Sequence, residues 1–177
     1  MIEKINVKKV INTVGSVETF NIIGTNSTIL NSWIGAQKEH EREIGSGRED
    51  IYFHLNDDKH TRIFYMEAKH LPMNKTKDKD EYVSGDEESG KISGGIQRYK
   101  ILIHGNPILN YYGMPAYIEN KTIESWVVSI NKKLEKIYPE DKPLRPISYQ
   151  NEYISTHRYT TLNDKWFSMH HFWINLT

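Results

Sequence analysis

Glu67 and Lys69 are the two residues of this chain whose types and spacing point most directly to chemistry. They close the run Ile63–Lys69, which is otherwise apolar and rich in β-forming residues, and such a run predicts a buried central strand. Successive side chains of a strand point to opposite faces, so Glu67 and Lys69 share one face and Ala68 lies on the other. Buried charges are costly unless they are paired. The pattern therefore predicts either a chemical site or an ordinary Glu–Lys pair at the end of a strand.

Asp50 supplies a second carboxylate that the neighbouring elements could bring to this strand. It precedes the strand-like run Ile51–Leu55, and the polar turn-forming residues 56–60 separate this run from the next strand. Two antiparallel strands joined by that turn would place Asp50 within reach of Glu67. Mg²⁺ binds hard oxygen ligands, usually one or two carboxylates together with water and substrate phosphate. The two acids and Lys69 therefore predict a divalent-cation site with a cationic group beside it for a phosphate or a water.

The order Asp50, sixteen residues, Glu67-x-Lys69 resembles the signature of the PD-(D/E)xK nuclease superfamily, whose members have the restriction-endonuclease-like fold. The proline of that signature is absent, because Glu49 stands before Asp50. The resemblance implies that Asp50, Glu67 and the backbone carbonyl of Ala68 hold Mg²⁺, with Mn²⁺ able to substitute. It also implies that Lys69 orients or helps to deprotonate the attacking water, whose pKa the metal lowers.

The stretch 26–47 predicts the first helix of the domain. A capping region is followed by apolar residues at helical spacing, then by charged residues and a Gly-Ser-Gly end. In the superfamily this helix often supplies one more acid to the metal site, and the candidates are Glu39, Glu41 and Glu43. Glu41 continues the inward row of the helix at four residues per step, so we expect it to be the metal ligand. A solvated charged face is the alternative for all three.

The stretch 74–91 is polar and poor in aromatic residues, and it predicts a long mobile loop that could close over nucleic acid or be an unstructured insertion. Gly94–Gly95 then opens a short helix, and a glycine-rich entry would let a phosphate approach backbone N–H groups. In the superfamily this helix commonly carries Gln, Arg or Tyr. The resemblance therefore implies that Gln97, Arg98 and Tyr99 contact substrate; an ordinary surface helix is the alternative.

The next elements have clear patterns. The stretch 111–118 predicts a strand, with Pro115 near an edge or a start. Apolar residues recur at helical spacing over 123–137, which predicts a helix capped by Asn120 and packed on the core. The stretch 142–146 contains two prolines and predicts a loop. None of these stretches is assigned any chemistry.

The C-terminal part alternates in the way of strands. The stretches 153–159 and 166–176 predict a β-hairpin that extends the sheet. His157, His170 and His171 raise the question of a zinc site, but His170 and His171 would point to opposite faces of one strand. We therefore expect no histidine metal site, and we place His157 and Arg158 near the rim of the active site.

Length and composition set the broad class of protein. The 177 residues predict a single domain, 1–177, that is large enough to bury a core. No long apolar run and no signal-peptide pattern occur, so we expect a cytoplasmic protein with no membrane partner. The absence of cysteine excludes disulfides, thiolate zinc sites and cysteine nucleophiles. With 23 basic and 23 acidic residues, any binding of nucleic acid must come from a local basic groove.

Together these features predict an α/β domain with a central mixed β-sheet flanked by α-helices, restriction-endonuclease-like, with a C-terminal β-hairpin. The resemblance implies a Mg²⁺-dependent endonuclease that cuts DNA, or else RNA, in a restriction or phage-defence setting. Two alternatives stay open: a non-catalytic member of the fold that binds nucleic acid or a partner protein, and a metal-free structural protein. The sequence leaves open the substrate form, the sequence specificity, the pathway and whether the chain forms a homodimer.

Overall fold

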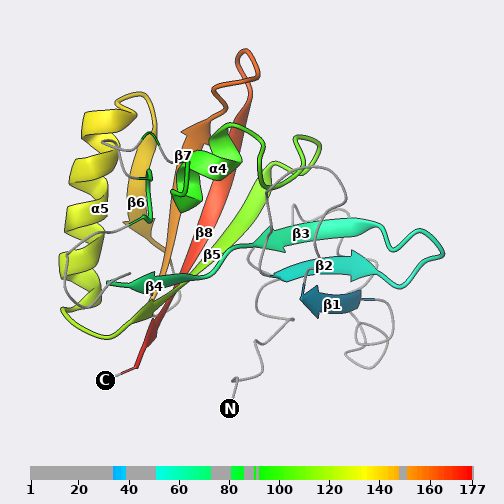
Figure 1. Cartoon of the computed structure of the whole chain (residues 1–177), viewed down its shortest axis with the longest axis horizontal. Coiled ribbons are helices and arrows are strands. Elements are labelled where there is room, and N and C mark those ends of the chain that lie inside the picture. The colour runs from blue at the N-terminus through cyan, green and yellow to red at the C-terminus, as the bar shows by residue number, and fades with distance from the viewer. Residues whose placement is uncertain are drawn as a thin grey trace.

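The computed structural model describes residues 51–72, 81–85, 90, 92–147 and 151–176, together with the backbone of 34–38. Within them, a mixed sheet of eight strands has the order β1-β2-β3-β5-β8-β7-β6, and β4 lies beside β5 (Figure 1). The strands are β1 (Ile34–Lys38), β2 (Ile51–Leu55), β3 (Arg62–Met66), β4 (Lys69–Leu71), β5 (Tyr111–Ile118), β6 (Lys142–Pro146), β7 (Glu152–Arg158) and β8 (Trp166–Asn175). The described helices are α4 (Gly95–Lys100) and α5 (Ile123–Ile137).

The sheet combines two hairpins with a parallel centre. β2 and β3 are antiparallel, and Thr61 donates its N–H and its hydroxyl to the carboxylate of Asp57 in the turn between them. β5 runs parallel to β8 along its whole length, while β7 pairs antiparallel with β8 and continues the sheet to β6. The mixed α/β sheet and the C-terminal hairpin are therefore confirmed. The restriction-endonuclease-like topology stays a prediction.

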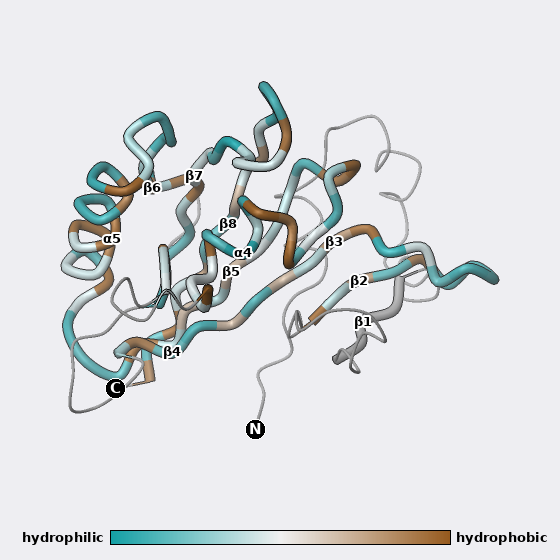
Figure 2. The backbone as a smooth tube through the Cα atoms, turned by 45° about the horizontal axis from the view of Figure 1, so that its top comes forward, coloured by the Kyte–Doolittle hydropathy of each residue, from teal (hydrophilic) through white to brown (hydrophobic). Residues whose placement is uncertain are grey.

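One face of the central strands carries the main core. Alternate residues of β5 and β8 are buried on this face, in the period of two that a strand imposes. α4 and α5 both add side chains to the same cluster, and the tube of α5 alternates between apolar and polar along its length (Figure 2). The core residues of these four elements are Ile96, Tyr99, Tyr112, Met114, Ala116, Ile118, Trp126, Val127, Ile130, Leu134, Phe167, Met169 and Trp173. Within the described residues, both helices thus cover one face of the sheet.

Three local predictions are wrong. Part of the predicted first helix forms β1, because antiparallel pairing with β2 outweighs the helical spacing of its apolar residues. The predicted loop 142–146 forms β6, whose prolines are tolerated because β6 is the last strand of the sheet order. Helix α5 has the predicted bounds, but its N-cap is Thr122, whose Oγ1 accepts from the N–H of Ser125, and not Asn120.

The predicted mobile loop is also wrong where it is described. Tyr82 and Val83 are fully buried in the core cluster, and the ring of Tyr82 stacks on Trp173 with centroids 5.6 Å apart. Residues 81–85 therefore form part of the packed interior. The rest of the predicted loop, apart from Gly90, lies outside the described residues.

Candidate functional site

The predicted strand carrying Glu67 is broken at Glu67. Met66 is the last residue of β3 and pairs with Gly113 of β5, and pairing resumes when Lys69 of β4 meets Ala116. The two residues between them belong to no strand. Glu67 and Lys69 nevertheless both turn toward α4, so the prediction that they share a face is confirmed.

Pro115 provides a physical reason for this break. It lies in the middle of a central strand, not at an edge or a start as predicted, between β4 on one side and β8 on the other. Glu67 donates its N–H to the carbonyl of Gly113 at 3.2 Å. In a regular parallel ladder, the same residue would then accept from the N–H of residue 115, and proline has none. The ladder therefore cannot continue past Glu67, and the chain turns there before β4.

Glu67 is the centre of a cluster of charged side chains. Only 3% of the residue is exposed, and its Oε1 lies 2.5 Å from Nζ of Lys69 and 3.2 Å from Nη1 of Arg98. Its Oε2 lies 3.6 Å from Nε2 of His104. Lys69 also donates to the carbonyl of Ser93 at 3.3 Å, which fixes the ammonium from a second side. One carboxylate is thus held by two cations in a largely buried position, with the imidazole of His104 beside its other oxygen.

The C-terminal end of α4 brings Arg98 and His104 together. Leu102 has a φ of +60°, a left-handed conformation that ends the helix and turns the chain back. The N–H groups of Ile103 and His104 then both donate to the carbonyl of Arg98, at 2.9 and 3.2 Å. The side chains meet as well, because Nη1 of Arg98 lies 3.3 Å from Nε2 of His104. A guanidinium only donates, so in this contact Nε2 of His104 accepts and Nδ1 carries the ring proton.

The N-terminus of α4 is closed, contrary to the expectation of a phosphate-binding entry. The N–H groups of residues 95–97 donate to the carbonyl oxygens of residues 81–83 at 2.8, 3.0 and 2.9 Å. Gly94 allows this close crossing, since a Cβ there would lie 2.2 Å from the Cα of Ser84. The glycines therefore serve backbone packing, and the first N–H groups of the helix are already satisfied within the protein.

Of the three predicted substrate-contacting residues, the structure brings Arg98 to Glu67. Gln97 instead accepts from the N–H of Gly85 at 2.9 Å and so helps to hold the crossing segment. Tyr99 lies in the core against Tyr112, with ring centroids 4.6 Å apart. Substrate contact by these side chains stays a prediction.

The predicted acid partners of Glu67 lie outside the described residues. These are Asp50 and the three candidates of the predicted first helix, Glu39, Glu41 and Glu43. Ile51, which follows Asp50 in the sequence, pairs with Met66, which precedes Glu67. Among the described residues, no group of three or more His, Asp or Glu side chains could hold a metal ion. The two-carboxylate site therefore remains a prediction.

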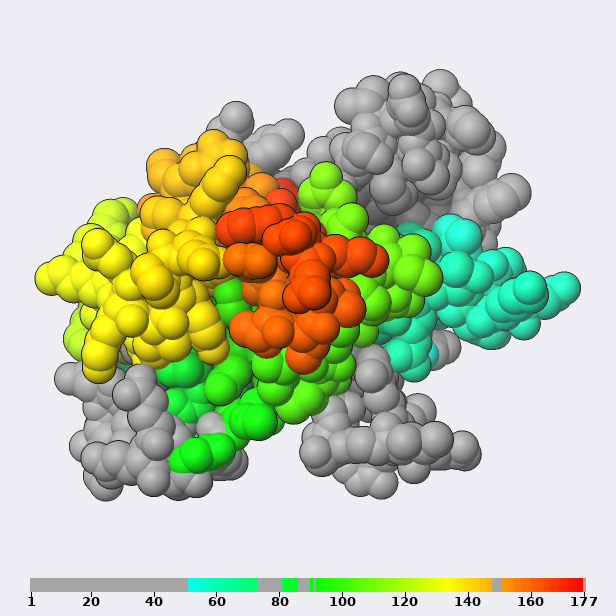
Figure 3. Space-filling view, turned by 90° about the horizontal axis from the view of Figure 1, so that it is seen from above, coloured from blue at the N-terminus to red at the C-terminus, as the bar shows by residue number. Residues whose placement is uncertain are grey.

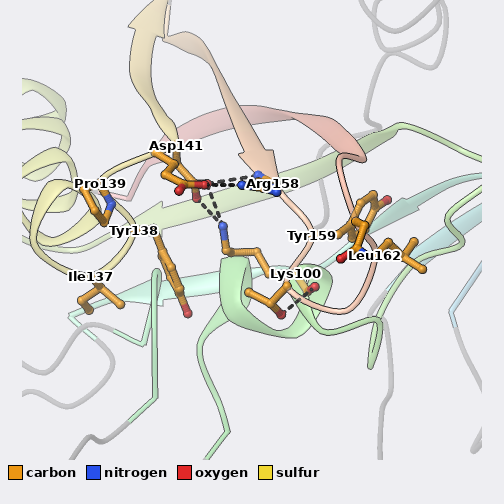
Figure 4. A pocket seen from close by; sticks show the side chains of 11 residues that line it. Lys100, Ile137, Tyr138, Pro139, Asp141, Arg158, Tyr159 and Leu162 are labelled. Atoms are coloured by element: carbon orange, nitrogen blue, oxygen red, sulfur yellow. Dashed lines mark hydrogen bonds and ion pairs between the residues drawn. The ribbon is translucent and has the colours of Figure 1, made fainter.

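The opposite side of α4 carries a second buried ion pair. Lys100 follows Arg98 by two positions, about 200° around the helix, and donates to both carboxylate oxygens of Asp141 at 2.7 Å (Figure 4). Burial lowers the pKa of Lys100, although Asp141 opposes this shift. Burial alone would raise the pKa of Asp141, but the hydrogen bonds and charges of His157 and Lys100 leave it below its ordinary value. The pair therefore stays ionised and fixes the last residue of α4.

A pocket of about 370 Å³ opens above this ion pair. In Figure 3, α5 and the residues that follow it adjoin the β7–β8 connection, whose residues form the other wall. The charged groups at this pocket are paired, since Arg158 binds Glu140 at 2.8 Å and Asp164 at 2.9 Å. The lining residues are Lys100, Ile137, Tyr138, Pro139, Glu140, Asp141, Arg158, Tyr159, Thr160, Leu162 and Asn163. This pocket does not include Glu67 and its partners.

Sequence reasoning missed His104 and Asp141, and it misplaced His157. The position of His104 depends on the left-handed turn at Leu102. Leucine rarely adopts this conformation, so the sequence gives no sign of the turn. His157 is fully buried beside Asp141 and lies on the far side of α4 from Glu67, so its expected place near the rim is not what the structure shows. His157 lies two residues after Ser155, and this spacing places both side chains on the same face of β7. It was the sequence signal that could have indicated their contact.

The fold and the site define an α/β protein with a buried carboxylate held between basic side chains at a break in a central strand. Comparison with protein-family models, with curated proteins and with solved structures found no match. None of the helices in the described part of the chain is long and apolar enough to cross a membrane.

Proposed function

We propose that the chain is a metal-dependent nuclease of the PD-(D/E)xK type that cuts a phosphodiester bond in DNA, or else in RNA. The observation that supports this proposal is the position of Glu67 and Lys69 at the strand break, with Arg98 reaching the same carboxylate oxygen. Two cations and one carboxylate leave a formal charge of +1 in the group. A partly buried cationic group of this kind suits a substrate phosphate.

Glu67 and the backbone carbonyl of Ala68 are the oxygen donors at the break that a magnesium or manganese ion would use. Mg²⁺ needs only one or two carboxylates when water and substrate phosphate complete its shell. Glu67 and the backbone carbonyl of Ala68 would supply the described ligands, and Asp50 and Glu41 are the further ligands that the resemblance implies. When bound, the ion would lower the pKa of a coordinated water and offset charge on the phosphate. Lys69 and Arg98 compete with any such ion for Glu67, because both contact its Oε1.

Lys69 has the clearest role among the residues of the chain. Its ammonium is held by Glu67 and by the carbonyl of Ser93, so it is already oriented before substrate binds. The phosphate gains negative charge in the transition state, and a preoriented ammonium stabilises this state more than the ground state. Arg98 holds the same carboxylate from α4 and so positions it relative to Lys69.

The test compares Lys69→Met with Lys132→Met in single-turnover cleavage of plasmid, single-stranded DNA and RNA. Methionine keeps the length of the Lys69 stem, whose Cε packs close to Gly95, while removing the charge. We expect wild type to cut with Mg²⁺ or Mn²⁺ and not with EDTA, and Lys69→Met to cut at least about 100-fold more slowly. Binding measured in Ca²⁺ should change little. Lys132 lies exposed on α5, so its variant should behave as wild type.

Equal cleavage by the two variants would show that the chemistry does not use Lys69. Cleavage by the wild type in the presence of EDTA would show that the reaction does not need a metal ion. Because all three proteins share one purification, a contaminating nuclease would give the same rate in each.

A non-catalytic binding protein of the same fold is the second candidate. It is favoured by the fact that Glu67 already has close basic partners, since such a cluster can simply brace α4 against the sheet. The two candidates differ in turnover. A wild type that binds nucleic acid in Ca²⁺ and never cuts it, with any metal tested, would decide for the binding protein.

A further inference from the structure

A chain of short hydrogen bonds crosses the buried core on the other side of α4. The hydroxyl of Tyr82 lies 2.8 Å from Nδ1 of His171, and Nε2 of His171 lies 2.7 Å from Oγ of Ser155. Ser155 Oγ lies 2.6 Å from Nε2 of His157, whose Nδ1 lies 2.7 Å from Oδ2 of Asp141. The first four residues are at most 2% exposed, and so is the side chain of Asp141. Such a fully satisfied buried network specifies one arrangement of its members.

The carboxylate of Asp141 fixes the direction of the chain. Lys100 donates to both of its oxygens, and the backbone N–H of Arg158 donates to Oδ1 at 3.0 Å. An ionised carboxylate only accepts, so Nδ1 of His157 must donate to it. When both imidazoles are neutral, every proton further along this hydrogen-bonded chain then has one place.

The proton positions follow one after another. His157 has its proton on Nδ1, so its Nε2 accepts from the hydroxyl of Ser155. Ser155 has used its only proton, so its Oγ accepts from Nε2–H of His171. Nδ1 of His171 then accepts from the hydroxyl of Tyr82. In the neutral state the two imidazoles are therefore opposite tautomers.

The surroundings favour the neutral rings. Burial lowers the pKa of His157, against the opposing effect of Asp141 and together with the charge of Lys100. Burial also lowers the pKa of His171, together with any charge on His157 and His170. Uncharged groups beside the two rings are Tyr82, Ser155 and the ring of Phe167, whose centroid is 5.3 Å from that of His157. A proton added to Nε2 of His157 would reverse the hydrogen bonds from Ser155 to Tyr82 and would place a positive charge in the buried network.

Both ends of this chain hold α4. Tyr82 accepts the N–H of Ile96 on its carbonyl, and Asp141 binds the ammonium of Lys100. We propose that the chain from Tyr82 to Asp141 positions α4, and with it Arg98, and that one added proton releases the helix before the sheet unfolds. This hydrogen-bonded chain of side chains is thus a built-in acid-sensitive switch. The proposal needs no catalytic role for Glu67 and is independent of the nuclease hypothesis.

The first test measures the two tautomers in wild type by long-range ¹H–¹⁵N correlation of the imidazoles at about pH 7.5. We expect His157 as the Nδ1–H tautomer and His171 as the Nε2–H tautomer. Equal tautomers, or a charged ring at this pH, would overturn the proposal. The measurement uses the unmodified protein, so it does not depend on how any variant folds.

The second test follows amide exchange of α4 and of β8 from about pH 7.5 to about pH 5.5, corrected for the intrinsic rates. We expect the protection of α4 to fall at least about tenfold more than that of β8. Tyr82→Phe keeps the ring but removes the donor to His171, so it should raise the pH of this loss by about one unit. Tyr111→Phe makes the same change at an exposed tyrosine and should leave the profile unchanged.

Loss of protection in α4 and β8 at one common pH would overturn the switch. If the pH profile of α4 exchange is the same in Tyr82→Phe and in Tyr111→Phe, the hydrogen-bonded chain does not control α4. If Tyr82→Phe does not fold, the tautomers and the wild-type exchange profile still decide the proposal.

Discussion

At the scale of single residues, Glu67 combines burial with ion pairing. Lys69 stands two positions away on the same side of the chain, a relation that the period of a strand makes predictable. Arg98 comes from a separate helix and His104 from the turn after it, and neither contact follows from a local pattern. A buried carboxylate of this kind is stabilised by its partners, and its partners in turn depend on its charge.

Replacing Glu67 by glutamine should therefore destabilise the fold, whatever the protein does. The variant leaves the ammonium of Lys69 and the guanidinium of Arg98 near a buried amide in place of a carboxylate. We expect a loss of about 2 kcal/mol in the free energy of unfolding, less than for a fully buried pair because Arg98 is partly exposed. Urea unfolding at neutral pH measures it. Glu135→Gln, on the exposed side of α5, should change stability by less than about 0.5 kcal/mol, and equal midpoints for the two variants would show that the cluster is not stabilising.

At the scale of elements, the sequence predicted those whose pattern is local. β2, β5, the β7–β8 hairpin and α5 follow from periods of two and of 3.6 residues and from turn residues. β1 and β6 were missed because pairing with a neighbouring strand decided their structure. The break after Met66 was missed for the same reason, since it depends on Pro115 in the adjacent strand. The glycines before α4 were recognised as special, but their partner is the backbone at Ser84 and not a phosphate.

Gly94→Ala should separate these two explanations of the glycines. The added Cβ would lie within 2.6 Å of three backbone atoms of Ser84, so one of the two segments must move. We expect a loss of about 3 kcal/mol in the free energy of unfolding, because buried overpacking against backbone has no side chain to relax. Chemical denaturation measures this loss without any ligand. Gly90→Asn is the control, since asparagine tolerates the positive φ of that site and nothing lies within 4 Å of the added Cβ. A Gly94→Ala protein as stable as wild type would mean that the crossing is looser than described.

At the scale of the whole molecule, the class of fold was predictable and the order of strands was not. Hydrophobic alternation determines which side of a strand is buried, but it carries no information on which strand lies beside it. The predicted sheet therefore had the right character, whereas the neighbours β5 and β8 could be found only in the structure. The same holds for the buried histidines, which the sequence located on strands without showing what surrounds them.

These histidines predict an acid-sensitive fold. Burial lowers the pKa of His170 to about 4 and also lowers those of His157 and His171. Below about pH 6.5 the unfolded chain therefore binds protons that the folded chain does not, and stability falls as the pH decreases. His170 alone should contribute a loss of about 2 kcal/mol between about pH 6.5 and about pH 5. Urea unfolding at a series of pH values measures the slope.

His170→Leu should flatten this slope and keep the stability at neutral pH. Nδ1 of His170 is buried and has no hydrogen-bond partner among the described residues, so an apolar side chain of similar size loses little there. His60→Asn, at an exposed histidine of the β2–β3 turn, should leave the slope as in wild type. A slope that is identical in all three proteins would show that His170 takes up its proton as readily in the folded chain as in the unfolded one.

The position of β8 has a consequence for how the chain acquires its fold. β8 follows every other described strand in the sequence, yet it lies between β5 and β7 and pairs with both along most of its length. Until it emerges, β5 lacks its partner on that side and β7 has only β6 beside it. Between the synthesis of β5 and that of β8, a nascent chain therefore holds an unfinished sheet with exposed strand edges, and chaperones that shield such edges would act on it in this interval.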